Sequence, residues 1–176
     1  MNMSIYLTNL GKYNEGCLVG KWVKLPVSED KLCAVLDEIG INEQYEEYFI
    51  TDYETDILGM CGVISEYSSV VALNDFAKTL CNLLDSDEEK FRAVMEAENC
   101  TSISEALELI EALDDFDLLP DVDSDEELGC YYADELGCIE IPDALASYFD
   151  YEAYGRDIRM EAAVTYTSYG CVIDNR

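Results

Sequence analysis

The chain has 176 residues and carries 39 acidic against 10 basic side chains, so its formal net charge is −29 at pH 7. This charge excludes ordinary nucleic-acid binding, which needs a basic surface, makes anionic membranes poor partners and indicates a basic partner instead. The hydrophobic content of 49% is enough to form a core, so the composition also argues against general disorder.

The sequence contains no histidine, and its eight cysteines are widely spaced without a Cys-x-x-Cys pair. We therefore expect no metal, no cofactor and mostly buried, reduced thiols in a cytoplasmic protein. Ser-His-Asp and Cys-His catalysis are excluded, and no glycine-rich phosphate-binding motif is present. Paired carboxylates remain as a catalytic option, but among 39 acidic residues a pair carries little information, so we expect no enzyme. Neither a signal peptide nor a transmembrane-length segment is expected.

Residues 1–61 predict a small α+β unit. Apolar and polar residues alternate over residues 4–10 and 17–25, which predicts an antiparallel pair of strands. Residues 29–39 have apolar side chains at helical spacing and are expected to form a helix, and residues 48–53 predict a third strand.

Residues 62–115 are expected to form a mainly helical unit. Helices are predicted near residues 70–84, 87–98 and 103–114. Two Ser-x-x-Glu sequences, which begin at Ser86 and Ser102, are interpreted as capping boxes because the hydroxyl and the carboxylate can satisfy free backbone N–H groups at a helix start.

The helix near residues 103–114 has an apolar stripe and an acidic face. Its acidic residues Glu105, Glu108, Glu111 and Asp115 are spaced i, i+3, i+6 and i+10, and they span roughly 15 Å at a rise of ~1.5 Å per residue. DNA phosphates lie about 3.4 Å apart along one strand, which is a comparable spacing. Like-charge neighbours cost ~0.2–0.5 kcal/mol per pair. Solubility, a high-salt environment and recognition by a DNA-holding protein are three explanations that the residues alone leave open.

Residues 116–176 predict a second α+β unit. We expect an edge strand at residues 116–119, a helix from the capping box at Ser124 to about Leu136, a helix that starts at Pro142, and a hairpin of residues 159–167 and 171–173. The sequence Asp121-x-Asp123-x-Asp125 has the first three ligands of a calcium loop. Glu126 and Tyr132 occupy the positions that require Gly and Glu, so a solvated acidic helix start is preferred.

The segment from Ile139 to Asp157 is the stretch in which residue order is most informative. Pro142 suits the first turn of a helix, and the aromatic residues that follow, together with Arg156, are expected to form one compact corner in which Arg156 pairs with a carboxylate. The residues singled out in this segment are Ile141, Pro142, Leu145, Tyr148, Phe149, Asp150, Tyr151, Tyr154, Gly155, Arg156 and Asp157.

This segment resembles the motif near the C-terminus of the ArdA family of antirestriction proteins. The run from Ile5 to Gly16, continued by Gly20, Trp22 and Pro26, is similar to the family's opening, and residues 43–54 are also similar. The resemblance implies DNA mimicry directed at type I restriction enzymes. It also implies an α+β protein built as an elongated chain of three small units (α+β, mainly helical, α+β), with the C-terminal unit at the centre of a homodimer.

On this basis we expect the chain to occupy the DNA-binding groove of a type I restriction–modification enzyme and to block restriction, with an effect on modification left open. The motif residues are expected to be structural or to lie at the dimer seam. An acidic chaperone or assembly factor for a basic protein is the alternative, and a metal-dependent enzyme is a third option. The carboxylates expected to replace DNA phosphates are Glu105, Glu108, Glu111, Asp114, Asp115, Asp121, Asp123, Asp125, Glu126 and Glu127.

Overall fold

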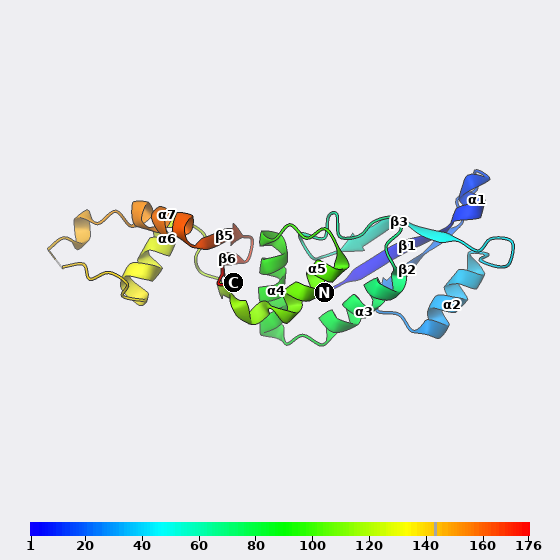
Figure 1. Cartoon of the computed structure of the whole chain (residues 1–176), viewed down its shortest axis with the longest axis horizontal. Coiled ribbons are helices and arrows are strands. Elements are labelled where there is room, and N and C mark those ends of the chain that lie inside the picture. Colours follow the sequence, from blue (N-terminus) through cyan, green and yellow to red (C-terminus); the bar gives the residue numbers. More distant parts are fainter. Residues whose placement is uncertain (143) are drawn as a thin grey trace. The chain divides into compact units, whose positions relative to one another are not determined.

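The computed structural model describes residues 1–142 and 144–176, which form two compact units (Figure 1). Unit 1 comprises residues 1–88 and 99–108, and unit 2 comprises residues 89–98 and 109–176. Helices combine with a three-stranded antiparallel sheet in each unit, so the predicted α+β class is confirmed. The division into three units at residues 61 and 115 stays a prediction.

The sheet of unit 1 contains β1 (Met3–Asn9), β2 (Gly20–Leu25) and β3 (Tyr48–Thr55), in the order β2-β1-β3 (Figure 1). Ile5 and Leu7 are fully buried, whereas Tyr6 between them is only half-buried. Since side chains alternate along a strand, the sheet has one face in the core and one outer face. The predicted strand pair and third strand are therefore confirmed.

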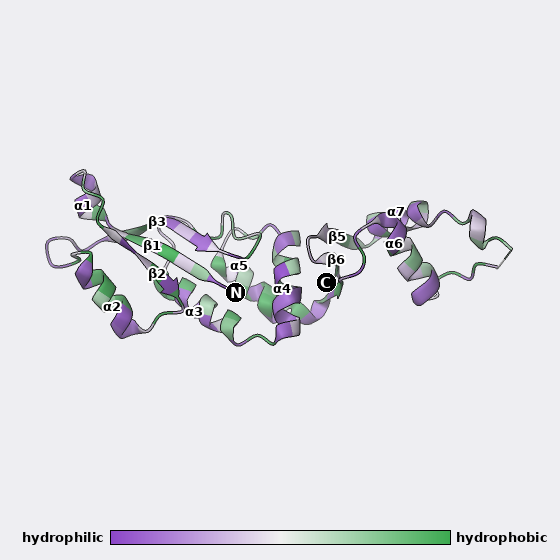
Figure 2. Cartoon of the chain, turned by 180° about the vertical axis from the view of Figure 1, so that it is seen from behind, coloured by the Kyte–Doolittle hydropathy of each residue, from purple (hydrophilic) through white to green (hydrophobic). Residues whose placement is uncertain are grey.

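Two helices lie in the connections between the strands of this sheet. A short helix, α1 (Leu10–Asn14), occupies the segment that was expected to be a loop, because the side chain of Asn9 accepts a hydrogen bond from the backbone N–H of Lys12 at 2.9 Å and caps the helix. The predicted second helix is confirmed as α2 (Glu29–Glu38). Figure 2 shows hydrophobic and hydrophilic residues alternating around its turns, as expected for a helix with one face in the core.

The predicted helices of the middle segment are present as α3 (Val70–Cys81), α4 (Asp85–Ala97) and α5 (Ile103–Glu111). The capping box at Ser86 was wrong, because the N–H of Glu88 already donates to the carbonyl of Leu84 at 2.8 Å. Helical hydrogen bonding therefore starts before Ser86, which lies inside the first turn of α4.

The sheet of unit 2 contains β4 (Phe116–Leu119), β5 (Ala163–Thr167) and β6 (Gly170–Asp174), in the order β4-β6-β5. The predicted edge strand and hairpin are confirmed, but β5 starts four residues later than expected because α7 (Tyr151–Glu161) continues through Arg159. A core cluster under this sheet contains Val122, Leu128, Cys171 and Ile173.

The predicted helix after Ser124 is confirmed, although its second half is wider than an α-helix. It begins as α6 (Asp125–Cys130) and continues as a π-helical turn over Tyr131–Glu135. Gly137 follows with a φ of +63°, a left-handed conformation that glycine adopts without steric cost and that ends the helix.

The helix predicted to start at Pro142 was wrong. Asp143 lies outside the described residues, and after it only a 3-10 turn over Ala146–Tyr148 precedes α7. Asp150 is the residue that starts regular helix, because its Oδ1 accepts a hydrogen bond from the N–H of Ala153 at 3.0 Å. Gly155, Arg156 and Asp157 consequently lie within α7.

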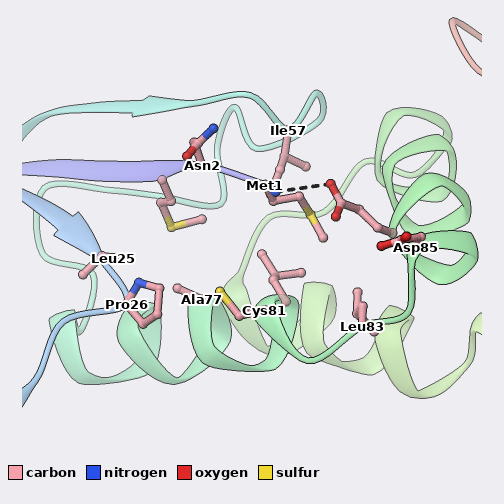
Figure 3. A pocket seen from close by; sticks show the side chains of 12 residues that line it. Met1, Asn2, Leu25, Pro26, Ile57, Ala77, Cys81, Leu83 and Asp85 are labelled. Carbon is pink, nitrogen blue, oxygen red and sulfur yellow. Dashed lines mark hydrogen bonds and ion pairs between the residues drawn. The ribbon is translucent and has the colours of Figure 1, made fainter.

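Unit 1 contains a cavity of about 250 Å³ beside its N-terminal strand (Figure 3). Leu25 and Pro26 approach it from the end of β2, Ala77 and Cys81 from α3, and Ile57 from the opposite wall. The Met1 ammonium nitrogen lies 3.2 Å from Oε1 of Glu88 at its margin. The lining of this cavity is mixed, because the apolar side chains from β2 and α3 lie beside polar groups of Asn2 and Asp85.

The expectation that most cysteines are buried was wrong. All eight are free thiols, but only Cys100 and Cys171 are buried. Cys33 and Cys81 lie on exposed positions of α2 and α3, where the apolar stripe of each helix does not reach. Burial raises the pKa of the Cys171 thiol to about 11. The exposed cysteines are Cys17, Cys33, Cys61, Cys81 and Cys138.

Candidate functional site

Five of the basic side chains form ion pairs with carboxylates of their own unit. Unit 1 has 5 basic and 18 acidic residues, a net charge of −13, and unit 2 has 5 basic and 21 acidic residues, a net charge of −16. With 39 acidic against 10 basic residues, carboxylates greatly outnumber the cations that could pair with them. The paired residues are Lys12 with Glu15, Lys21 with Glu38, Lys78 with Asp75, Arg159 with Asp125, and Arg176 with Glu98 and Asp174.

Three predicted carboxylates lie on α5, and all three are exposed: Glu105, Glu108 and Glu111. The capping box at Ser102 is present in part, since the Ser102 hydroxyl accepts from the N–H of Glu105 at 3.2 Å. The Glu105 carboxylate also accepts from the N–H of Thr101 at 2.7 Å. These hydrogen bonds, led by the Thr101 N–H and hydroxyl, lower the pKa of Glu105. Glu105 is therefore partly committed to holding its own helix.

Asp114 and Asp115 lie in a 3-10 turn, Leu113–Asp115, and not on α5. The regular spacing predicted from Glu105 to Asp115 was therefore wrong beyond Glu111. Phe116, which is 1% exposed, must enter the core as the first residue of β4, and the chain leaves the α-helical path to place it there. Both aspartates are exposed.

Asp123 and Glu127 are linked at the start of α6. Ser124 caps this helix by accepting from the N–H of Glu127 at 3.4 Å, while Oε2 of Glu127 accepts from the N–H of Asp123 at 2.8 Å. The Asp123 N–H, followed by Ser124, lowers the pKa of Glu127, and the nearby Glu127 carboxylate raises the pKa of Asp123. Asp121 and Glu126 on either side are exposed.

Among the carboxylates that were predicted to replace DNA phosphates, Asp125 makes the most hydrogen bonds to other side chains. Its Oδ1 accepts from Nε of Arg159 at 2.7 Å and from the hydroxyl of Tyr166 at 2.8 Å, and its Oδ2 accepts from Nη2 of Arg159 at 3.1 Å. Arg159, and next Tyr166, lower the pKa of Asp125. The carboxylate is ionised but already neutralised, so it joins α6 to α7 and β5.

The helices α6 and α7 approach one another backbone to backbone through two glycines. A Cβ atom on Gly155 would collide with the carbonyl oxygen of Asp125 and lie 2.7 Å from the nitrogen of Gly129. A Cβ atom on Gly129 would in turn collide with the carbonyl oxygen of Tyr151. Gly155 thus has a packing role, and the signal for it in the sequence is a glycine within a helical pattern.

The aromatic corner forms with fewer members than predicted. The ring centroid of Phe149 lies 4.8 Å from that of Tyr151 and 5.5 Å from that of Tyr154. Tyr148 is 84% exposed and stays outside this cluster. Arg159, which the sequence did not single out, pairs with the carboxylate of this region, whereas Arg156 is exposed and pairs with no carboxylate among the described residues.

The remaining motif residues lie at or near the surface. Leu145 is 56% exposed, Ile141 is half-buried, and Pro142, Asp150 and Asp157 are exposed. Over residues 1–142 and 144–176, no three His, Cys, Asp or Glu side chains are arranged to hold a metal ion. Within the same ranges, no helix is long and apolar enough to cross a membrane.

Comparison with protein families identifies one that covers almost the whole chain. Residues 5–173 match the family described as antirestriction protein (ArdA). Comparison with curated proteins finds no match. The family assignment implies an antirestriction function that involves restriction enzymes. The chain therefore belongs to the ArdA family of antirestriction proteins.

Proposed function

We propose that the chain is a DNA mimic that occupies the DNA-binding groove of a type I restriction–modification enzyme and blocks restriction. The observation that carries this proposal is a set of exposed carboxylates that form no ion pair within residues 1–142 and 144–176. Asp125 is excluded from this set by its pairing with Arg159, and Glu105 and Glu127 are partly used as helix caps. The members of this free carboxylate set are Glu108, Glu111, Asp114, Asp115, Asp121 and Glu126.

The chemistry of a DNA-binding groove suits these groups. Lys and Arg side chains that normally hold phosphates form charge-assisted hydrogen bonds with carboxylates. Carboxylates offer acceptors but none of the base edges that carry sequence information. Inhibition should therefore not depend on the recognition sequence of the enzyme. Modification requires the same DNA, so its inhibition is expected wherever both activities share one groove.

A homodimer is part of the proposal. Several large apolar side chains in or next to the motif segment are exposed, which is the usual mark of a covered interface. We assign this exposed apolar group, rather than the acidic surface, to the contact between two copies, because two acidic surfaces would repel one another. Its members are Leu136, Ile139, Leu145, Tyr148 and Met160.

Neutralisation of part of the free carboxylate set tests the mimicry. The variant E108Q/E111Q/D114N/D115N removes four exposed charges, and E43Q/E46Q/E47Q/E54Q removes four exposed charges from unit 1 as a matched control. In a cleavage assay with a purified type I enzyme, we expect the first variant to need at least about 10-fold more protein for half-inhibition, a loss near 1.4 kcal/mol. The control is expected to stay within about twofold of the parent.

Equal losses in the two variants would contradict the assignment, because they would mean that net charge alone matters. Failure of the parent chain to inhibit any of several type I enzymes would contradict the mimicry itself. In that case, tight binding of a basic protein without displacement by duplex DNA would favour the chaperone alternative.

The dimer is tested separately with the substitution Y148S. Tyr148 is 84% exposed and makes no ring contact with the part of the chain that the structure describes, so its replacement should not affect the fold. We expect the dimer dissociation constant, measured by analytical ultracentrifugation, to rise about 10-fold or more, as for an aromatic anchor in an interface. An unchanged constant would place the interface elsewhere, and Y67S is the control because Tyr67 is a similarly exposed tyrosine of unit 1.

A further inference from the structure

The outer face of the unit 1 sheet carries aromatic side chains, among them the 41% exposed Trp22. Tyr6 lies directly opposite Trp22 on β2 and Asp52 on β3, so these three residues form one row across the sheet. The ring centroids of Tyr6 and Trp22 are 5.3 Å apart in an edge-to-face arrangement. Trp22 remains 41% exposed, although its partner Tyr6 shields part of it.

More aromatic rings continue this face beyond the row. Phe49 on β3 contacts Tyr13 of α1 edge to face, with ring centroids 5.2 Å apart, and stacks on Tyr67 at 6.4 Å. Tyr13 is 51% and Tyr67 is 74% exposed. The rings of Tyr6, Tyr13, Trp22 and Phe49 border an open hollow of about 480 Å³, which we call the aromatic groove. Its lining includes Tyr6, Tyr13, Trp22, Phe49, Asp52 and Glu66.

Two carboxylates, Asp52 and Glu66, stand in this lining without a cation. Both are exposed, and neither pairs with a Lys or Arg side chain among the described residues. Oδ1 of Asp52 accepts from the N–H of Tyr53 at 2.8 Å, which restrains this exposed side chain. The neighbouring row of the sheet has one charge of each sign, Lys24 and Glu54. Its net charge is therefore zero, and it does not offset the negative charge of the groove.

We propose that the aromatic groove binds an arginine side chain presented by a partner protein. A guanidinium group stacks on aromatic faces, and Trp is the best platform for it, while its planar N–H groups match a carboxylate. The pairing of exposed rings with unneutralised carboxylates selects this cation over the other occupants. A nucleic-acid strand would need a basic groove to accompany the rings, and a second copy of the chain would bring a further net charge of −29.

This site is separate from the free carboxylate set, and it needs no DNA-like geometry. Its ligand is a single stacked cation and not a row of phosphate-binding groups. It gives unit 1 a contact with a basic protein partner that does not depend on whether the mimicry proposal is correct.

The sequence contains one tryptophan, so the fluorescence of Trp22 reports on the groove directly. The test is a titration of the full chain with a blocked Gly-Gly-Arg-Gly-Gly peptide at about 0.15 M ionic strength, where long-range attraction is screened. We expect a saturable change in Trp22 emission with a roughly millimolar dissociation constant. The control is the same peptide with citrulline in place of arginine, which has nearly the same shape but no charge, and we expect no saturable change with it.

The variant D52N/E66Q keeps every ring and removes both carboxylate charges of the groove. We expect it to weaken binding of the arginine peptide about 10-fold, whereas E43Q/E46Q, which removes two exposed charges elsewhere in unit 1, should change it less than about twofold. Equal effects of the two variants, or equal binding of the citrulline peptide, would overturn the proposal. It would also be overturned by a change in Trp22 emission on self-association alone, which would identify a second copy as the occupant.

Discussion

At the scale of single residues, the chain separates carboxylates that hold the fold from carboxylates that are free to bind. Asp125 is neutralised by Arg159 and Tyr166, and Glu105 and Glu127 satisfy backbone N–H groups at helix starts. Glu108 and Asp114 have no such partner among the described residues. An acidic residue in this sequence is therefore not by itself a candidate for target binding, because its hydrogen bonds decide its role.

The substitution D125N tests the structural role of Asp125. Because Arg159 and Tyr166 lower the pKa of Asp125, the carboxylate stabilises the fold fully above its ordinary pKa of 3.8, and that contribution is lost as the pH falls through the lowered value. We expect D125N to lower the thermal unfolding midpoint by a constant amount between about pH 5 and pH 8. The difference from the parent chain should shrink below about pH 4, as measured by circular dichroism.

A constant difference that persists well below pH 4 would contradict this role. Y166F is the companion variant, since it removes one hydrogen bond to Asp125 but leaves the Arg159 pair in place. It should lower the midpoint less than D125N does.

At the scale of elements, the contact between α6 and α7 depends on Gly129 and Gly155. We expect G155A to destabilise the chain by about 1–3 kcal/mol, because the new Cβ collides with the carbonyl oxygen of Asp125 and the helices must separate. Alanine is favoured over glycine in a helix by about 1 kcal/mol, and this gain partly offsets the collision. The measured loss in the free energy of unfolding is therefore smaller than the energy of the collision itself.

Urea denaturation of G155A and of a control, G62A, measures this effect. Gly62 has a φ of +96° and open space around its Cβ position, so the control reports backbone strain without a collision. A G155A variant as stable as the parent chain would contradict the close approach of the two helices.

The elements that could be predicted from the sequence are those whose signal is local. Alternation predicted β1 and β2, and helical spacing predicted α2 and α3, because each has one face in a core. The helix expected at Pro142 failed since the effective cap is Asp150, and α1 was missed since Asn9 acts as its cap. Capping residues are common in loops, so they identify a helix start only where the following residues also pack.

The candidate site was predictable in its composition but not in its connections. Asp125 and Arg159 are 34 residues apart in the sequence, and no periodicity links them. The i, i+3 spacing correctly exposed Glu105, Glu108 and Glu111, but it could not show that α5 ends before Asp114 and Asp115. Which acidic residues are neutralised depends on tertiary contacts, and the aromatic groove likewise depends on rings brought together from separate segments.

At the scale of the whole molecule, the net charge of −29 should oppose folding through self-repulsion. Added NaCl shortens the Debye length from about 30 Å at an ionic strength of about 0.01 M to about 3 Å at about 1 M. We expect the thermal unfolding midpoint to rise by several degrees over this range, because the repulsion between the surface charges is screened. The variant E108Q/E111Q/D114N/D115N should show a smaller rise. A midpoint that does not change with salt would contradict the idea that uncompensated surface charge is retained at a cost in stability.

The most direct test of the central claim is competition with DNA. Inhibition of a purified type I restriction enzyme is titrated at several concentrations of duplex that lacks the recognition sequence. Mimicry predicts that the protein concentration for half-inhibition rises in proportion to the duplex concentration and that inhibition weakens with salt. Inhibition that is independent of added duplex would contradict occupation of the DNA-binding groove, even if the antirestriction activity itself were strong.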